Sequence, residues 1–256
     1  FVGSRLGKRF VSKKQSFSII DKVVSPYFPE VTIEQNICDK DSLVLSCPKA
    51  SAIIHLAAEH RDDVRPKSLY NEVNVEGTRN VCSMAEKQGI NQIIFTSTVA
   101  VYGFAKVGTD ESGAIDPFND YGRTKYEAEQ VLLEWQLRDP EVRSLVIIRP
   151  TVIFGEQNRG NVYNLLKQIA SGKFVMIGDG KNSKSMAYVE NVAAFIEHSL
   201  GFGPSVHLYN YIDKPDVSMN KLVSTVYGML GKSPKIGLRI PYLIGFAGGK
   251  LLDVAA

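Results

Sequence analysis

Short apolar runs of strand length alternate with longer helical patterns along most of this chain. The strand-like runs are rich in Ile, Val and Phe with little polar alternation, which is typical of parallel strands buried on both faces. They cover residues 16–21, 31–34, 52–57, 92–97, 145–149 and 206–212. The helical patterns cover residues 3–14, 67–88, 121–138, 162–170 and 189–200. Because strand–helix–strand units build a doubly wound parallel sheet, we predict a Rossmann-type α/β fold.

The alternation loosens beyond about residue 155, where a polar loop and several glycine-containing turns replace it. We expect residues 1–155 to form the cofactor-binding Rossmann domain. Residues 156–256 are expected to form mainly a small C-terminal lobe that binds substrate, with a segment at about 186–212 returning to the Rossmann sheet. Both ends of the chain resemble interrupted elements, since no strand precedes the first helical pattern and a further helical pattern at 251–256 has no stop signal. We therefore expect the first strand of the Rossmann domain to be missing.

The composition argues against several classes of partner. The 256 residues carry a formal net charge of +3, so charge gives no argument for nucleic acid or for a membrane surface. The sequence has no signal peptide at its start and no apolar run of about 18 residues. The three cysteines cannot all pair, and the four histidines show no metal-ligand spacing. We expect a cytoplasmic protein without metal, nucleic-acid or membrane partners.

Two segments carry groups suited to moving a proton on and off an alcohol. Thr98 follows a buried strand-like run, Tyr121 comes 23 residues later, and Lys125 follows it by four residues on the same helix face. A free tyrosine has a pKa near 10, and a nearby ammonium favours the phenolate. We predict that Tyr121 is the catalytic base, that Lys125 lowers its pKa, and that Thr98 holds the substrate oxygen. The alternative is that Tyr121 and Lys125 are only an exposed pair on a helix, but this does not account for the hydroxyls at the strand end.

A glycine at the start of a helix and an acidic residue at a strand end suggest a dinucleotide site. Gly3 precedes the first helical pattern, and Asp21 ends the next strand-like run 18 residues later. Such a glycine turn binds pyrophosphate, and the carboxylate binds the adenosine ribose. A glycine that permits close helix packing is the alternative for Gly3. Asp21 favours NAD over NADP because a carboxylate repels a 2′-phosphate, although Lys22 beside it leaves NADP open.

Further candidates follow from single positions. Leu56, Ala57 and Ala58 end a strand-like run, and small side chains there allow a cofactor to approach the backbone; ordinary strand–helix packing is the alternative. Asn74 interrupts a helical run and is a candidate cofactor contact; it would brace the active-site strand or stand exposed. Asn161 and Lys184, with Arg159, lie in the C-terminal region, and each is either a donor to a diphosphate-bearing substrate or a surface residue. These alternatives stay open on the residues alone.

Five segments occur in an order and spacing that resemble one family. They are HLAA at 55–58, NVEGT at 74–78, FTSTVAVYG at 95–103, YGRTK at 121–125 and RPTVIFG at 149–155. In them the chain closely resembles the extended short-chain dehydrogenase/reductases, and within these the NAD-dependent nucleotide-sugar epimerase/dehydratase branch. The resemblance covers nearly the whole chain. It implies a Rossmann sheet with a small C-terminal substrate lobe, and NAD as cofactor.

The resemblance assigns cofactor contacts residue by residue. Gly3 matches the third glycine of the family's GxxGxxG motif. The place of the adenine-binding Asp-hydrophobic pair is held by Asn36 and Ile37, and an asparagine oxygen still accepts from the adenine amino group. Thr96 and Pro150 match positions that line the nicotinamide.

The resemblance also assigns contacts to substrate. Tyr121 and Lys125 match the residues that contact the nicotinamide ribose and transfer the proton, and Thr98 with Tyr121 would touch the substrate. Lys184 matches an arginine that reaches the substrate diphosphate. Val152 departs from an asparagine found in many relatives, which puts the details of substrate contact in doubt.

The residues after Thr98 narrow the reaction. Dehydratases and decarboxylating relatives place acidic residues there, and relatives that epimerise at C3 and C5 place a cysteine; here the positions hold Val99 and Ala100. Neither side chain exchanges protons, so the chemistry is confined to one alcohol carbon.

We hypothesise an NAD-dependent nucleotide-sugar 4-epimerase that acts on a UDP-hexose or UDP-N-acetylhexosamine through a transient 4-keto intermediate. The alternative is an NAD(P)H-dependent reductase of a 4-keto nucleotide sugar or another ketone. A third hypothesis is a regulatory protein that senses NAD without turnover. Relatives commonly pair through two helices, so we also expect a homodimer formed through residues 67–88 and 121–138.

Overall fold

The computed structural model describes residues 1–61, 63–233 and 236–246. The chain divides into two compact units, which are described separately. Unit 1 consists of Phe1–Thr151 and Val189–Tyr211. Unit 2 consists of Val152–Tyr188 and Ile212–Ala256.

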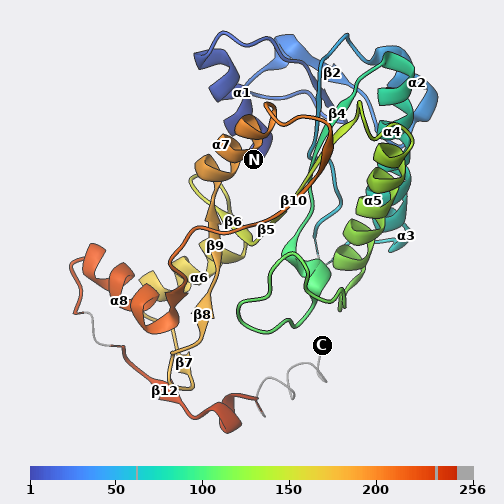
Figure 1. Ribbon diagram of the computed structural model, residues 1–256. Coiled ribbons are helices and arrows are strands. Elements are labelled where there is room, and N and C mark those ends of the chain that lie inside the picture. Colours follow the sequence, from blue (N-terminus) through green and yellow to red (C-terminus); the bar gives the residue numbers. More distant parts are fainter. Residues whose placement is uncertain (62, 234–235, 247–256) are drawn as a thin grey trace. The chain divides into compact units, whose positions relative to one another are not determined.

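Parallel strands form the centre of unit 1 (Figure 1). A four-stranded sheet has the order β10 (Ser205–Tyr211), β5 (Ser144–Pro150), β4 (Gln92–Thr96) and β3 (Ile53–His55). The strands β1 (Ile19–Asp21) and β2 (Thr32–Glu34) form a separate parallel pair. All seven residues of β5 are buried, as expected of a strand flanked by two parallel neighbours and covered on both faces.

Helices cover both faces of the four-stranded sheet (Figure 1). One face carries α2 (Lys40–Ser46), α4 (Gly77–Gln88) and α5 (Asp120–Leu137), and the other carries α1 (Val2–Ser12) and α7 (Val189–Ser199). The helix α3 (Ser68–Asn71) runs into α4 through a π-helical turn, η2 (Glu72–Glu76). Two 3₁₀ turns, η1 (Pro29–Val31) and η3 (Val99–Tyr102), complete unit 1.

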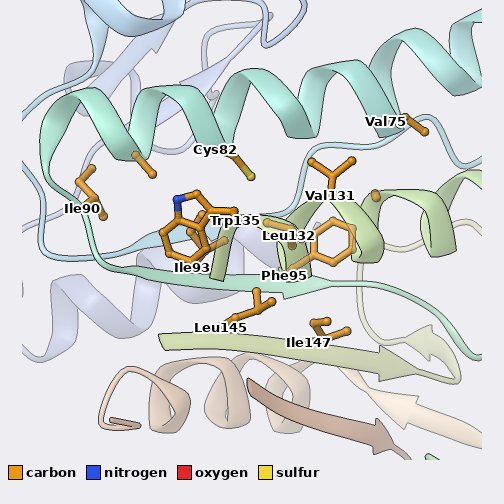
Figure 2. Close-up of a cluster of buried hydrophobic side chains, with 12 residues drawn as sticks. Val75, Cys82, Ile90, Ile93, Phe95, Val131, Leu132, Trp135, Leu145 and Ile147 are labelled. Atoms are coloured by element: carbon orange, nitrogen blue, oxygen red, sulfur yellow. The ribbon is translucent and has the colours of Figure 1, made fainter. Parts of the chain in front are cut away.

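The core of unit 1 lies between α4, α5 and the sheet (Figure 2). Its buried members are Val75, Cys82, Ala85, Ile90, Ile93, Phe95, Ala128, Val131, Leu132, Trp135, Leu145 and Ile147. They come from η2, α4, α5, β4 and β5, so a single apolar cluster joins the strand that precedes Thr98 to the helix that carries Tyr121 and Lys125. The cluster thereby fixes the two halves of the predicted catalytic set on one rigid support.

Unit 2 is smaller and has shorter strands. It contains β6 (Val152–Phe154), α6 (Asn161–Ala170), β7 (Met176–Ile177), β8 (Ser183–Lys184), β9 (Met186–Tyr188), β11 (Val217–Ser218), α8 (Met219–Met229) and β12 (Arg239–Ile240). The strands pair as β6 with β9, β8 with β11, and β7 with β12. A second apolar cluster, centred on Ile169 and Val223, packs α6 against α8.

The predicted Rossmann-type α/β fold is confirmed, and several elements differ from the sequence prediction. The helix predicted at 67–88 contains the π-helical turn η2, and the helices α2 and α8 and the short strands β6, β7, β8, β9, β11 and β12 were not predicted. The helix α2 is only seven residues long, too short to show a clear helical period; its start is fixed by the cap of Asp39, whose side chain accepts the Ser42 N–H. The helical pattern at 251–256 lies outside the described residues.

The loop between η3 and α5 turns sharply at Gly103, which has a left-handed φ of 62°. A β-carbon at this position would lie 1.9 Å from the carbonyl oxygen of Asp116, whose own N–H donates to the carbonyl of Val101 at 3.0 Å. Two backbone segments of the same loop are therefore in contact at a position where only glycine fits.

We expect Gly103→Ala to lower the free energy of unfolding by at least about 2 kcal/mol, because the new methyl group adds a backbone clash to an unfavourable φ. Gly108→Ala is the matched control, since Gly108 has a φ of +87° with open space around its Cβ position. Urea unfolding of both variants measures the difference. Equal losses in the two variants would show that the contact with Asp116 contributes nothing.

Candidate active site

The hydroxyl of Thr98 lies where the strand β4 passes into η3. Thr98 is the N-cap of η3, and its Oγ1 accepts the backbone N–H of Ala100 at 3.1 Å. The Thr98 side chain also acts to lower the pKa of the Tyr121 phenol. Two of the three predicted catalytic groups therefore lie near one another.

The first turn of α5 brings Tyr121 to that position. Asn119 caps the helix, with its Oδ1 accepting the N–H of Gly122 at 2.8 Å. A β-carbon on Gly122 would lie 2.6 Å from the carbonyl oxygen of Ala100, so the glycine allows α5 to touch η3. This close approach places the Tyr121 phenol beside Thr98.

Lys125 follows Tyr121 by one helical turn and is buried, with 2% of its surface exposed. Its ammonium lies 3.9 Å from the centroid of the Phe95 ring, a cation–π contact. Burial lowers the pKa of Lys125 to about 7, while the nearby carboxylate of Glu129 acts in the opposite direction. Both the charged and the neutral lysine are thus populated near neutral pH.

Burial raises the pKa of the Tyr121 phenol, and the Thr98 side chain partly offsets this. The sequence analysis expected the ammonium of Lys125 to lower this pKa instead. The structure differs because the phenol is half-buried, and the loss of water disfavours the phenolate. Lys125, whose own pKa falls to about 7, is not among the groups that shift the pKa of Tyr121.

Asn74 is buried in the π-helical turn and joins two elements next to the site. Its side chain accepts the N–H of Glu59 at 2.8 Å and donates to the Glu59 carbonyl at 3.0 Å and to the Thr124 hydroxyl at 2.9 Å. It therefore fastens the loop after β3 to α5, beside Lys125. The bracing role that the sequence suggested is directed at this loop and helix; cofactor contact stays a prediction.

His55 ends β3 as a neutral side chain. Its Nε2 lies 2.9 Å from the hydroxyl of Thr78, and that hydroxyl donates to the carbonyl of Asn74 at 2.6 Å. The hydroxyl has one proton, so it accepts from His55 and the imidazole proton is on Nε2. Burial lowers the pKa of His55 to about 3, and the charge of Lys125 acts in the same direction.

The remaining cofactor candidates follow the carboxyl ends of successive strands. Asp21 ends β1, Asn36 and Ile37 follow β2, and Thr96 ends β4. Leu56, Ala57 and Ala58 follow β3, and Pro150 ends β5.

Two of these side chains already accept hydrogen bonds from backbone N–H groups of their own loops. Asp21 accepts the N–H of Val23 at 3.2 Å, and the Oδ1 of Asn36 accepts the N–H of Cys38 at 3.0 Å. Each oxygen has a second lone pair, so both assignments stay predictions.

Asn161 and Lys184 belong to unit 2. Asn161 is the exposed first residue of α6, and Lys184 is half-buried on β8, opposite Val217 of β11. Their contact with a substrate diphosphate stays a prediction. Among the described residues, no group of three or more His, Cys, Asp or Glu side chains is placed to hold a metal ion. Within the same residues, no helix has both the length and the apolar character to cross a membrane.

The sequence analysis missed a buried ion pair next to this site. Arg149 in β5 and Glu129 in α5 form a two-pronged pair, with Nε–Oε1 at 2.9 Å and Nη2–Oε2 at 2.5 Å. The available signals were an arginine in a fully apolar strand and a glutamate four residues after Lys125, on the same helix face.

The chain matches one family by sequence. A profile of the 3-beta hydroxysteroid dehydrogenase/isomerase family matches residues 1–198. The chain is 50% identical to the N-acetyl-alpha-D-glucosaminyl-diphospho-ditrans,octacis-undecaprenol 4-epimerase of Escherichia coli O157:H7. The match extends over 257 residues and covers 99% of the chain and 76% of that protein. It is 29% identical over 208 residues to the UDP-glucose 4-epimerase of Vibrio cholerae, covering 77% of the chain but only 62% of that relative.

Solved structures agree on the fold. The UDP-glucose 4-epimerase of Thermotoga maritima, with UDP-glucose, matches with a TM-score of 0.79 at 21% identity, over 94% of this chain and 82% of that one. The UDP-glucuronic acid 4-epimerase of Bacillus cereus, in complex with NAD, matches with a TM-score of 0.77 at 20% identity, over 94% and 84%. At these identities the likeness supports the fold alone. The family profile and the 50% identical relative confirm the resemblance stated from the motifs. The chain belongs to the 3-beta hydroxysteroid dehydrogenase/isomerase family of extended short-chain dehydrogenase/reductases.

Proposed function

We propose that this chain is an NAD-dependent 4-epimerase of a sugar linked to a diphosphate. The observation that carries the proposal is the close approach of α5 to η3 at Gly122, which brings Tyr121 beside Thr98, with the buried Lys125 one turn away. No acidic side chain lies within η3, which follows Thr98, so the set serves one alcohol carbon. The 50% identical relative is named as a 4-epimerase, which supports the same reaction.

The described residues fit NAD. The start of α1 lies against the loop after β3, where a β-carbon on Gly3 would be 3.5 Å from the Leu56 side chain, so this helix start and the small residues Ala57 and Ala58 form one edge. An exposed carboxylate, Asp21, ends β1 and suits a ribose hydroxyl. NAD would supply the hydride acceptor and, later in the cycle, the hydride donor.

In the proposed reaction, Tyr121 takes the proton of the sugar 4-hydroxyl while Thr98 holds that oxygen by a hydrogen bond. The charged form of Lys125 favours the phenolate, which the buried site otherwise opposes. After the 4-keto sugar has rotated to present its other face to the cofactor, Tyr121 returns the proton to the new alcohol. Tyr121 therefore begins and ends the cycle as the phenolate and carries the proton only while the 4-keto sugar exists, so the cycle leaves no net change on the enzyme.

We propose an N-acetylhexosamine as the sugar, and a polyprenol as the carrier on its diphosphate. The relative that covers 99% of the chain is named for such a lipid-linked substrate, while the 29% identical relative is named for UDP-glucose. Asn161 and Lys184 are candidates for diphosphate contacts with either carrier. A UDP-sugar is the competing substrate. The second candidate function is a one-way ketone reductase, which the steroid-dehydrogenase members of the family support.

A homodimer and a cytoplasmic location complete the proposal. The helices α4 and α5 pack side by side, and they are the candidates for pairing with a second copy. A monomer in light scattering at micromolar concentration would exclude the dimer.

We expect the full-length protein, incubated with NAD and polyprenyl-diphospho-N-acetylglucosamine, to form the C4 epimer without net NADH. NMR of the product and absorbance of reduced cofactor measure both quantities. UDP-glucose and UDP-N-acetylglucosamine are tested in parallel, and faster turnover of either would reassign the carrier. If no sugar is epimerised and NAD(P)H is consumed only with a 4-keto substrate, the enzyme is a reductase.

We expect Tyr121→Phe to reduce turnover by about 10²- to 10⁴-fold, because the variant has no group to move the hydroxyl proton. Tyr126→Phe, on the same helix, is the control and should retain turnover. Calorimetry with NAD should show unchanged cofactor affinity in both variants. Full turnover by Tyr121→Phe would remove the tyrosine from the mechanism.

We expect the burial of Lys125 to make stability depend on pH. The folded pKa of about 7 lies below the usual value of 10.5, so the unfolded chain binds more protons between these values. The free energy of unfolding of the wild type should therefore rise relative to that of Lys125→Met as pH increases from 7 towards 10.5. Urea unfolding at pH 7 and 9 tests this, and parallel curves for the two proteins would show that the lysine is not perturbed.

A further inference from the structure

A buried chain of polar side chains crosses unit 1 from β4 to β10. The Ser97 hydroxyl donates to Oε1 of Glu129, and both carboxylate oxygens of Glu129 accept from Arg149. The remaining guanidinium nitrogen donates to the Tyr102 hydroxyl at 2.6 Å, and that hydroxyl donates to Oδ1 of Asn210 at 2.8 Å. The first four residues are each at most 5% exposed.

Three members of this network adjoin a part of the catalytic set. Ser97 directly precedes Thr98, and Tyr102 ends the η3 turn that Thr98 caps. Glu129 lies one turn beyond Lys125 on α5, which also carries Tyr121. The bond from Ser97 to Glu129 therefore ties the strand end that carries Thr98 to the helix that carries Tyr121.

Net stability is a poor explanation for this arrangement. Removing two charges from water costs several kcal/mol each, and buried ion pairs of this kind often contribute little compared with apolar residues of the same volume. A fully hydrogen-bonded pair does, however, specify one geometry among several that an apolar core would tolerate. The carboxylate of Glu129 has fixed partners in both β4 and β5, so it sets the position of α5 along these strands.

We propose that Ser97 and Glu129 are positioning residues for the reaction, which hold the hydroxyl of Thr98 beside the phenol of Tyr121. Arg149 and Tyr102 act behind them by fixing the carboxylate of Glu129. The inference rests on the proposed function for its kinetic test, and on the proximity of Thr98 and Tyr121 alone for its spectroscopic test.

The test compares two buried serines of the same sheet. Ser97→Ala removes the bond to Glu129, whereas Ser144→Ala removes a hydroxyl that donates to the Phe202 carbonyl at 3.2 Å, at the opposite end of β5. Both variants lose one buried hydrogen bond and leave the ion pair of Glu129 and Arg149 intact. Thermal unfolding confirms that both fold and measures the loss of stability in each.

We expect Ser97→Ala to lower kcat about tenfold with KM unchanged, because a small misplacement of the reacting groups affects the transition state more than binding. Ser144→Ala should retain the wild-type kcat. A kcat of Ser97→Ala within about twofold of wild type, in a folded and active preparation, would overturn the proposal.

The spectroscopic test needs no turnover. With ¹³C at the ring carbon that carries the tyrosine hydroxyl, the Tyr121 signal is assigned by its loss in Tyr121→Phe. The signal should shift in Ser97→Ala and stay in place in Ser144→Ala. If it stays in place in both, the proposal fails; if it shifts in Ser97→Ala while the wild type turns over no sugar, the positioning survives and the proposed function fails.

Discussion

The contact between the first turn of α5 and the carbonyl of Ala100 is the constraint on which the rest of the site depends. Gly122 allows it, and it is the reason that Thr98 and Tyr121, 23 residues apart in sequence, lie beside one another. The apolar cluster around Phe95 and Leu132 holds the same helix and strand together further along. Core packing therefore fixes the positions of the reacting groups, because a densely packed core resists small displacements.

Electrostatics in this site follow from burial more than from the pairing of charges. The ammonium of Lys125, the phenol of Tyr121 and the imidazole of His55 all have pKa values shifted towards their neutral forms. A site whose titratable groups favour their neutral forms suits a reaction in which a proton is moved away and then returned. The aromatic face of Phe95 gives the lysine a partner that attracts its cation without competing for a proton.

The sequence was sufficient for the fold class and for the residues in direct sequence motifs. Thr98, Tyr121 and Lys125 were predictable because a strand end and a helical spacing of four place them on fixed geometric supports. Sequence reasoning could not predict the pKa shift of Tyr121, because burial depends on what packs over the helix. Glu129 was missed for a related reason: a glutamate on a helix is usually solvated, and only the tertiary fold puts Arg149 opposite it.

The π-helical turn before α4 has a consequence for how the loop after β3 is anchored. One turn with an additional residue changes the helical phase, so that the Asn74 amide reaches the loop and α5 while its carbonyl accepts from Thr78, the partner of His55. A regular α-helix of the same sequence would change the phase of every residue beyond the turn by about 100°. Forcing this segment into a regular α-helix without shortening it would thus uncouple three elements at once, although it would remove no side chain from the catalytic set.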